Sequence, residues 1–123
     1  MSSTYETIRY ETTEDRAYIT FDRPEQHNSM TEEMIYEVAE ALNDADDDED
    51  VRVIIVTGAG ERAFSAGGDL DSMIPAITSG EFPLGRGIAE DPDADMFMKH
   101  HLVRTPIVAA VNGVAIAGGT EFL

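Results

Sequence analysis

The stretch that decides the fold is residues 51–57, VRVIIVT, a nearly continuous run of β-branched residues. A run of this kind is typical of a central strand that is covered on both faces of its sheet. Residues 106–111, PIVAAV, form a second apolar run, and a glycine-containing turn follows each of the two. Buried strands that lead through such turns toward a helix predict an α/β fold. The length of 123 residues allows one domain with one core.

Further elements are expected on both sides of the first run. Residues 4–12 and 16–22 predict two strands joined by a turn at Glu14 and Asp15. The second of these strands alternates apolar and polar residues, which indicates a half-buried strand. Another helix is expected at residues 93–103.

A helix is predicted between the second strand and the first apolar run. Ser29 is expected to cap it, with Glu32 three residues later completing a capping box. The acidic run at residues 43–50 is expected to end the helix as a solvated loop. The buried face of this helix is predicted from apolar residues at helical spacing, which are Met34, Ile35, Val38, Ala41 and Leu42.

The composition is strongly acidic. The sequence has 25 Asp and Glu residues against 8 Lys and Arg residues, which gives a formal net charge of −17. This charge argues against a nucleic-acid partner and against an anionic membrane surface, because both bind basic faces. Self-repulsion should destabilise the folded chain at low salt, so we expect a halophilic protein adapted to molar salt. The alternative is an acidic surface that meets a basic partner.

No signal for export or membrane insertion is visible in the sequence. The first residues, MSSTYE, lack the basic and apolar regions of a signal peptide. No apolar run approaches the length of about 20 residues that a membrane span needs. The chain has no cysteine, which excludes disulfides and a thiolate nucleophile. We therefore expect a cytoplasmic protein with no membrane partner.

The loops of small residues after the two apolar runs are the candidate site. In an α/β fold, ligands bind beyond the carboxyl ends of the strands, and glycine lets a backbone approach a ligand closely. If the loops face each other, the backbone N–H groups of Gly68 and Gly118 can converge on one oxygen as an oxyanion hole. Glu121 lies one helical turn beyond Gly118, where a carboxylate can move a proton beside that oxygen.

A purely structural interpretation of these residues stays open at this point. Glycine pairs after strands are mostly turns, and an acid such as Glu121 commonly complements the dipole in the first turn of a helix. The histidines lack metal-ligand spacing, and Ser29 and Ser65 lack the Gly-x-Ser-x-Gly frame of a serine nucleophile. Dinucleotide and phosphate-loop motifs are also absent from the sequence, so we expect neither a metal nor a separate cofactor.

Three ordered segments carry a resemblance to a known family. Residues 63–70, AFSAGGDL, resemble the first signature of the enoyl-CoA hydratase/isomerase (crotonase) family. Residues 105–121, TPIVAAVNGVAIAGGTE, resemble the second signature. Residues 21–24, FDRP, and 28–30, NSM, are similar to the family's early loop that contacts coenzyme A. The resemblance implies a crotonase-like α/β fold, in which repeated ββα units form a spiral.

The resemblance also implies an activity and a set of site residues. The family binds acyl-CoA thioesters and stabilises a thioester enolate with two backbone N–H groups, which match Gly68 and Gly118. Its first catalytic glutamate matches Glu121, and its hydratases add water across the double bond of a 2-enoyl-CoA. Coenzyme A enters this chemistry as part of the substrate rather than as a cofactor. The residues that match the family's coenzyme A contacts are Gln26, His27, Ala66, Asp69 and Leu70.

The chain departs from the family pattern in its length and in its charge. Family members continue for about as many residues again, so residues 1–123 are interpreted as the N-terminal portion of a truncated crotonase-like domain. The family's second glutamate and the C-terminal helices that build its homo-trimers or hexamers are then missing. Glu25 stands where a lysine is frequent, which removes a cation from near the coenzyme A phosphates.

Two functions of different class remain open on the sequence. The first is hydration of a 2-enoyl-CoA, with isomerase, thioester hydrolase or decarboxylase chemistry as near alternatives. The second is a non-catalytic chain, either a partial acyl-CoA-binding fold or a subunit of a split protein that needs a complementary chain. Turnover of crotonyl-CoA by the purified chain distinguishes the two.

Overall fold

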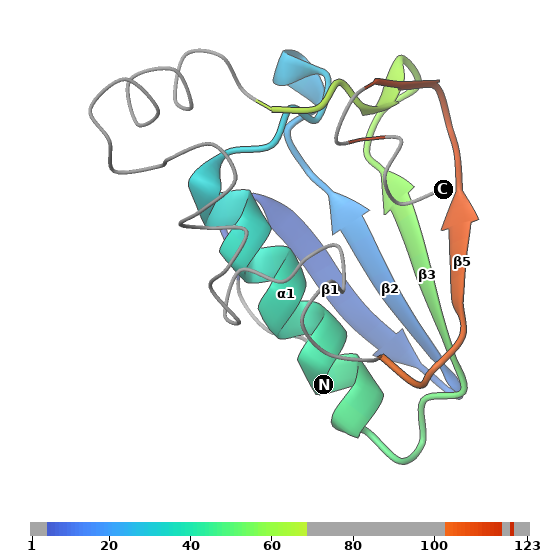
Figure 1. The fold of residues 1–123 in the computed structure, drawn as a ribbon. Coiled ribbons are helices and arrows are strands. Elements are labelled where there is room, and N and C mark those ends of the chain that lie inside the picture. Colours follow the sequence, from blue (N-terminus) through green and yellow to red (C-terminus); the bar gives the residue numbers. More distant parts are fainter. Residues whose placement is uncertain (1–4, 69–102, 117–118, 120–123) are drawn as a thin grey trace.

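A computed structural model describes residues 5–68, residues 103–116 and Gly119. Its main feature is a four-stranded sheet in the order β1-β2-β3-β5 (Figure 1). The strands β1 and β2 are antiparallel, whereas β3 runs parallel to both β2 and β5. The predicted α/β fold is therefore confirmed. The strands span β1 (Ile8–Thr13), β2 (Arg16–Phe21), β3 (Val53–Gly58) and β5 (Ile107–Ala110).

Helix α1 (Glu32–Asp47) packs against β1 and β2 on one face of this sheet (Figure 1). The predicted apolar face is confirmed, because all five of its residues are buried. The predicted cap is wrong, since Thr31 caps the helix and its Oγ1 accepts a hydrogen bond from the Met34 N–H at 3.1 Å. Ser29 instead accepts a hydrogen bond from Arg23 Nη1 at 3.0 Å. The helix also continues to Asp47, into the acidic run that was expected to end it.

The two apolar runs are less covered than their sequences predict. In β3, Ile54 and Val56 are fully buried, whereas Val53, Ile55 and Thr57 are only half-buried. In β5, Val108 is 52% exposed, so the predicted burial of this strand is wrong within the described residues. The reason lies in the strand order, because β5 forms one edge of the described sheet and α1 packs against the other half. Apolar composition marked these strands correctly, but it did not indicate their place in the sheet.

A second, two-stranded sheet was not predicted. It consists of β4 (Ala63–Ser65) and β6 (Val114–Ala115), which are parallel. A 3-10 helix, η1 (Pro24–Gln26), lies between β2 and α1. Almost all of the helix predicted at residues 93–103 lies outside the described residues, as does the start of the helix predicted after Gly118. The part of the chain that the structure describes has no helix long and apolar enough to cross a membrane.

Candidate functional site

The candidate site lies at the end of the main sheet where its parallel strands finish. Because β2, β3 and β5 run in the same direction, their carboxyl ends share this edge (Figure 1). The chain segments that leave them are residues 22–30, 59–68 and 111–116. Ligands of α/β folds bind beyond such carboxyl ends. The carboxyl ends of these strands are therefore where the site predicted from the glycine loops would lie.

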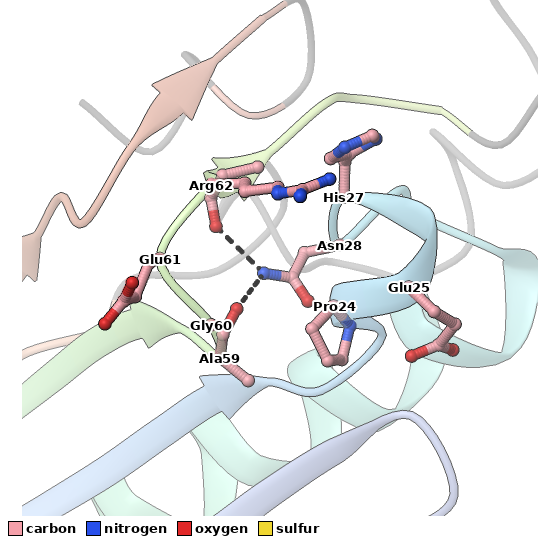
Figure 2. A pocket seen from close by; sticks show the side chains of 9 residues that line it. Pro24, Glu25, His27, Asn28, Ala59, Gly60, Glu61 and Arg62 are labelled. Atoms are coloured by element: carbon pink, nitrogen blue, oxygen red, sulfur yellow. Dashed lines mark hydrogen bonds between the residues drawn. The ribbon is translucent and has the colours of Figure 1, made fainter.

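Asn28 is the polar centre of this end of the molecule. Its side chain is fully buried, and its backbone has a positive φ of 54°, a conformation that asparagine tolerates better than most residues. Its amide nitrogen donates to the carbonyl oxygens of Ala59 and Ala63, both at 3.0 Å (Figure 2). Its amide oxygen accepts a hydrogen bond from the Arg23 N–H at 2.9 Å. One side chain thus connects three parts of the site.

The segment around Gly67 is held by hydrogen bonds to residues 27–30. The Ala66 N–H donates to the His27 carbonyl at 3.0 Å, and the Met30 N–H donates to the Gly67 carbonyl at 2.6 Å. The fully buried Ser65 hydroxyl donates to the Asn28 carbonyl at 2.8 Å and accepts from the Gly67 N–H at 3.2 Å. These contacts fix the peptide groups on both sides of Gly67.

The direction of the Gly68 N–H follows from these contacts. The described residues contain no cis peptide bond, so the C=O of Gly67 and the N–H of Gly68 point in opposite directions across one planar peptide group. Because the Gly67 carbonyl faces the Met30 N–H, the Gly68 N–H is directed away from Met30. Gly68 is also exposed, so a ligand can reach this donor.

The second glycine loop begins beside the first one. Ser65 pairs with Ala115 across the β4–β6 ladder, and the Ile116 N–H donates to the Ser65 carbonyl at 3.0 Å. Gly119 is buried against Ser65, since a β-carbon built on it would overlap the Ser65 carbonyl oxygen. The two loops are therefore neighbours, as the sequence analysis required. Gly118 and Glu121 themselves lie outside the described residues.

Asn112 joins the turn after β5 to the turn after β3. Its side-chain oxygen accepts a hydrogen bond from the Gly58 N–H at 3.0 Å. Its amide nitrogen donates to the carbonyls of Gly60 and Ala63 at 3.0 and 3.1 Å. Like Asn28, it was not selected from the sequence as a site residue. Both asparagines lie inside segments that resemble the family, residues 28–30 and 105–121, and that was the available signal.

Two hollows open on this end of the chain. A pocket of about 390 Å³ lies between residues 24–28 and 59–63 (Figure 2). A second hollow of about 270 Å³ is lined by apolar residues of β4 and β6 together with His27, Arg62 and Ala66. Figure 2 shows the Arg62 side chain extended toward His27, and both side chains line both hollows.

The predicted coenzyme A contacts are partly brought together. His27 and Ala66 line the second hollow, and Gln26 precedes His27 at the exposed end of η1. Asp69 and Leu70 lie outside the described residues. Arg62 was missed, although an arginine next to a signature motif in so acidic a sequence was a usable signal. In the described part of the chain, no group of three His, Asp or Glu side chains is placed to hold a metal ion.

Fold and site together define an α/β protein whose neighbouring small-residue loops present a backbone amide at the carboxyl ends of the parallel strands of a mixed sheet. Comparison with known proteins makes the class specific, because the enoyl-CoA hydratase/isomerase family matches residues 11–123. The chain therefore belongs to this family, and its fold is the crotonase fold.

Relatives and solved structures agree with this assignment. The chain is 40% identical over 105 residues to a probable peroxisomal enoyl-CoA hydratase of Arabidopsis thaliana. The aligned region covers 85% of the chain and 36% of that relative. It is 32% identical over 120 residues to a crotonyl-CoA hydratase of Syntrophomonas wolfei, covering 95% and 43%. The crystal structure of an enoyl-CoA hydratase/isomerase from Xanthobacter autotrophicus superposes with a TM-score of 0.79 at 36% identity, covering 96% and 43%. The chain thus spans less than half the length of each of these three proteins.

Proposed function

We propose that this chain contributes an oxyanion hole for the thioester carbonyl of an acyl-CoA, formed by the N–H groups of Gly68 and Gly118. One observation carries the proposal, namely the parallel pairing of β4 with β6, in which Ser65 stands opposite Ala115. Gly68 and Gly118 each follow this pair by three residues. Gly119, which follows Gly118, packs against the Ser65 carbonyl. Both proposed donors thus lie within a few residues of Ser65, which favours two amides directed at one oxygen.

The proposed reaction is hydration of a 2-enoyl-CoA. When the oxygen of water bonds to the β-carbon, the electrons of the double bond move onto the thioester oxygen, which becomes an enolate. Two preorganised N–H donors stabilise that charge, and a single donor of this kind is typically worth about 3 kcal/mol. Glu121 is proposed to move a proton between water and the α-carbon, so that the elements of water end up on the two carbons.

Coenzyme A is proposed to lie along residues 26–27 and 66–70. His27 and Ala66 line the smaller hollow, and Gln26, Asp69 and Leu70 complete the set that the family resemblance assigns. Arg62 adds a positive charge in the same hollow. A substrate with several phosphate charges meets a chain of net charge −17, so we propose that binding and folding both require screening by molar salt.

Hydratase activity of the whole relatives is part of the proposal rather than a property of these residues alone, because the chain spans 36–43% of their lengths. The interpretation of residues 1–123 as the N-terminal portion of a crotonase-like domain belongs to it as well. A second candidate function is acyl-CoA binding without turnover, in a chain that works with a complementary chain. It is favoured by four exposed apolar side chains on and beside β5 and β6, which are Val108, Val111, Val114 and Ile116.

Both candidates are tested with crotonyl-CoA and the purified chain in molar KCl. Hydration removes the conjugated enoyl thioester, so its ultraviolet absorbance falls. Glu121→Gln should lower this rate strongly and leave the affinity for coenzyme A unchanged. The control is Glu40→Gln, which removes one acid from the exposed face of α1.

The outcomes separate the candidates. Turnover that depends on Glu121 supports the hydratase, with the molecular mass in solution giving the oligomeric state. Saturable binding of crotonyl-CoA without turnover supports the second candidate. A chain that binds neither crotonyl-CoA nor coenzyme A refutes both.

A further inference from the structure

Asn28 makes more hydrogen bonds than the packing of a loop needs. Its N–H donates to the Arg23 carbonyl at 2.8 Å, and its carbonyl accepts from the Ser65 hydroxyl at 2.8 Å. Its side-chain amide uses both of its donor hydrogens, on Ala59 and Ala63, and its oxygen takes the Arg23 N–H. An apolar side chain would fill the same buried space without requiring the three hydrogen bonds that the Asn28 side chain makes. The polar network therefore fixes orientation as well as filling volume.

The network leads directly to the proposed oxyanion donor. Asn28 holds the start of β4 through Ala63 and holds the Ser65 hydroxyl through its own carbonyl. That hydroxyl in turn accepts the Gly67 N–H, while Met30, two residues after Asn28, holds the Gly67 carbonyl. Both peptide groups that flank Gly67 are thus tied to residues 28–30.

Gly67 needs these hydrogen bonds because glycine, which has no side chain, does not by itself fix the orientation of the peptide group that follows it. It has a φ of 87°, in a region that glycine enters about as readily as the ordinary one. Rotation of the peptide between Gly67 and Gly68 would turn the Gly68 N–H toward Met30 and present a carbonyl oxygen to the ligand instead. A carbonyl in that place would repel the thioester oxygen that the N–H is proposed to bind.

We infer that Asn28 and Ser65 are positioning residues for the Gly67–Gly68 peptide. The Asn28 side chain fixes its own backbone against Ala59 and Ala63, its backbone carbonyl orients the Ser65 hydroxyl, and that hydroxyl holds Gly67 so that the Gly68 N–H is directed at the substrate carbonyl. The inference rests on the role proposed for Gly68 and extends it to two side chains that do not touch the substrate. It assigns the polarising power of the first loop to the buried Asn28–Ser65 pair.

The test measures polarisation of a bound thioester rather than turnover. Cinnamoyl-CoA, a conjugated 2-enoyl-CoA, absorbs at longer wavelength when hydrogen-bond donors polarise its carbonyl, so its difference spectrum on binding reports the oxyanion hole. The variants are Ser65→Ala, which removes both hydroxyl contacts, and Asn28→Asp, which keeps the shape and the acceptor for Arg23 but loses the amide donors. The control is Thr105→Val, which removes a hydroxyl hydrogen bond to Asp46 at the opposite end of β5 from the loops.

The expected result is a red shift in the parent chain and in Thr105→Val that is reduced or lost in the two variants. Their affinity for cinnamoyl-CoA should fall about five- to tenfold, as loss of one hydrogen bond predicts, while their affinity for coenzyme A without an acyl group stays the same. The Asn28→Asp spectrum should recover in part as the pH is lowered, because a protonated carboxyl regains one donor. Folded variants that keep the full red shift overturn the inference, and so does a control that loses as much as they do.

A second measurement separates this inference from the proposed function. If the parent chain gives no red shift, the proposed oxyanion hole is refuted, and the orientation of the Gly68 N–H is then measured by its residual dipolar coupling in the parent and in Ser65→Ala. A changed coupling keeps the positioning role of the network, whereas an unchanged coupling overturns it. If Asn28→Asp does not fold, Ser65→Ala decides by the same criteria.

Discussion

The contact between Phe21 and Phe64 connects the site to the core, and its energy can be measured. Phe21 ends β2 and Phe64 lies in β4, immediately before Ser65. Both rings are fully buried, with their centroids 5.3 Å apart and their planes at 69°. An edge-to-face pair of this geometry is worth about 0.5–1.5 kcal/mol beyond the apolar area it buries.

A double-mutant cycle isolates that energy. Phe21→Leu and Phe64→Leu should each lower the free energy of unfolding by about 1–3 kcal/mol, because each removes buried volume from the core. The double variant should lose less than the sum of the two by about 0.5–1.5 kcal/mol, since the ring contact can be removed only once. The measurement is urea unfolding at constant molar KCl, with the midpoint and the slope fitted for all four proteins.

A second double-mutant cycle, between two residues that are not in contact, gives the error of the coupling energy. Phe21→Leu combined with Val108→Ala should be additive, because Val108 is 52% exposed on β5, which lies two strands from β2 in the sheet. Additivity normally holds to within about 0.3–0.5 kcal/mol. A Phe21–Phe64 coupling inside that error would refute the argument that the ring pair attaches β4 to the main sheet.

Three further predictions concern pH and salt. Hydrogen bonds from Thr105 and from the Arg104 backbone outweigh burial and lower the pKa of Asp46, so its stabilising contribution should be present above about pH 4 and be lost as the pH falls below that value. In urea unfolding between pH 6 and pH 3, Asp46→Asn should lose less stability on acidification than the parent chain. An equal loss in both proteins would contradict this role of Asp46. Burial, with Asp44 and Asp48 nearby, raises the pKa of Tyr10 to about 12. Stability should therefore fall as the pH rises from about 10 toward 12, and ultraviolet titration of Tyr10→Phe should lack the late phenol that the parent shows. Unfolding should require more urea in molar KCl than in dilute buffer, and a flat salt response would end the halophilic interpretation.

The local elements were predictable because each depends on neighbours in the sequence. The buried face of α1 follows from a period of 3.6 residues, and the inward residues of β2 follow from a period of two. The first residue of helix α1 was harder to predict from the sequence. Ser29 and Thr31 are both good caps, and the choice of Thr31 depends on the Arg23 side chain, which occupies the Ser29 hydroxyl. A contact made by another part of the chain therefore decided between two locally equivalent caps.

The site divides in the same way. The first signature named Gly68 and Ala66, and the resemblance of the early loop named His27. The structure places His27 and Ala66 in one hollow, and the role of Gly68 stays a proposal. The sequence placed Asn28 and Asn112 in family-like segments but did not indicate their hydrogen-bonding roles, because their partners lie up to 54 residues away along the chain. Pairing of β4 with β6 was also not predicted, since a strand of two or three residues carries no periodic signal.

By itself, the sequence determined the alternation of strands and helix, the acidic surface and the two glycine loops with their family resemblance. Tertiary structure alone decided that Ser65 pairs with Ala115, that β5 lies at an edge of the sheet formed by the described residues, and that the Gly67–Gly68 peptide turns its N–H away from Met30. The physical reason is that composition and period fix what each segment can bury, whereas the direction of a peptide group depends on the hydrogen-bonding partners that distant segments bring to it.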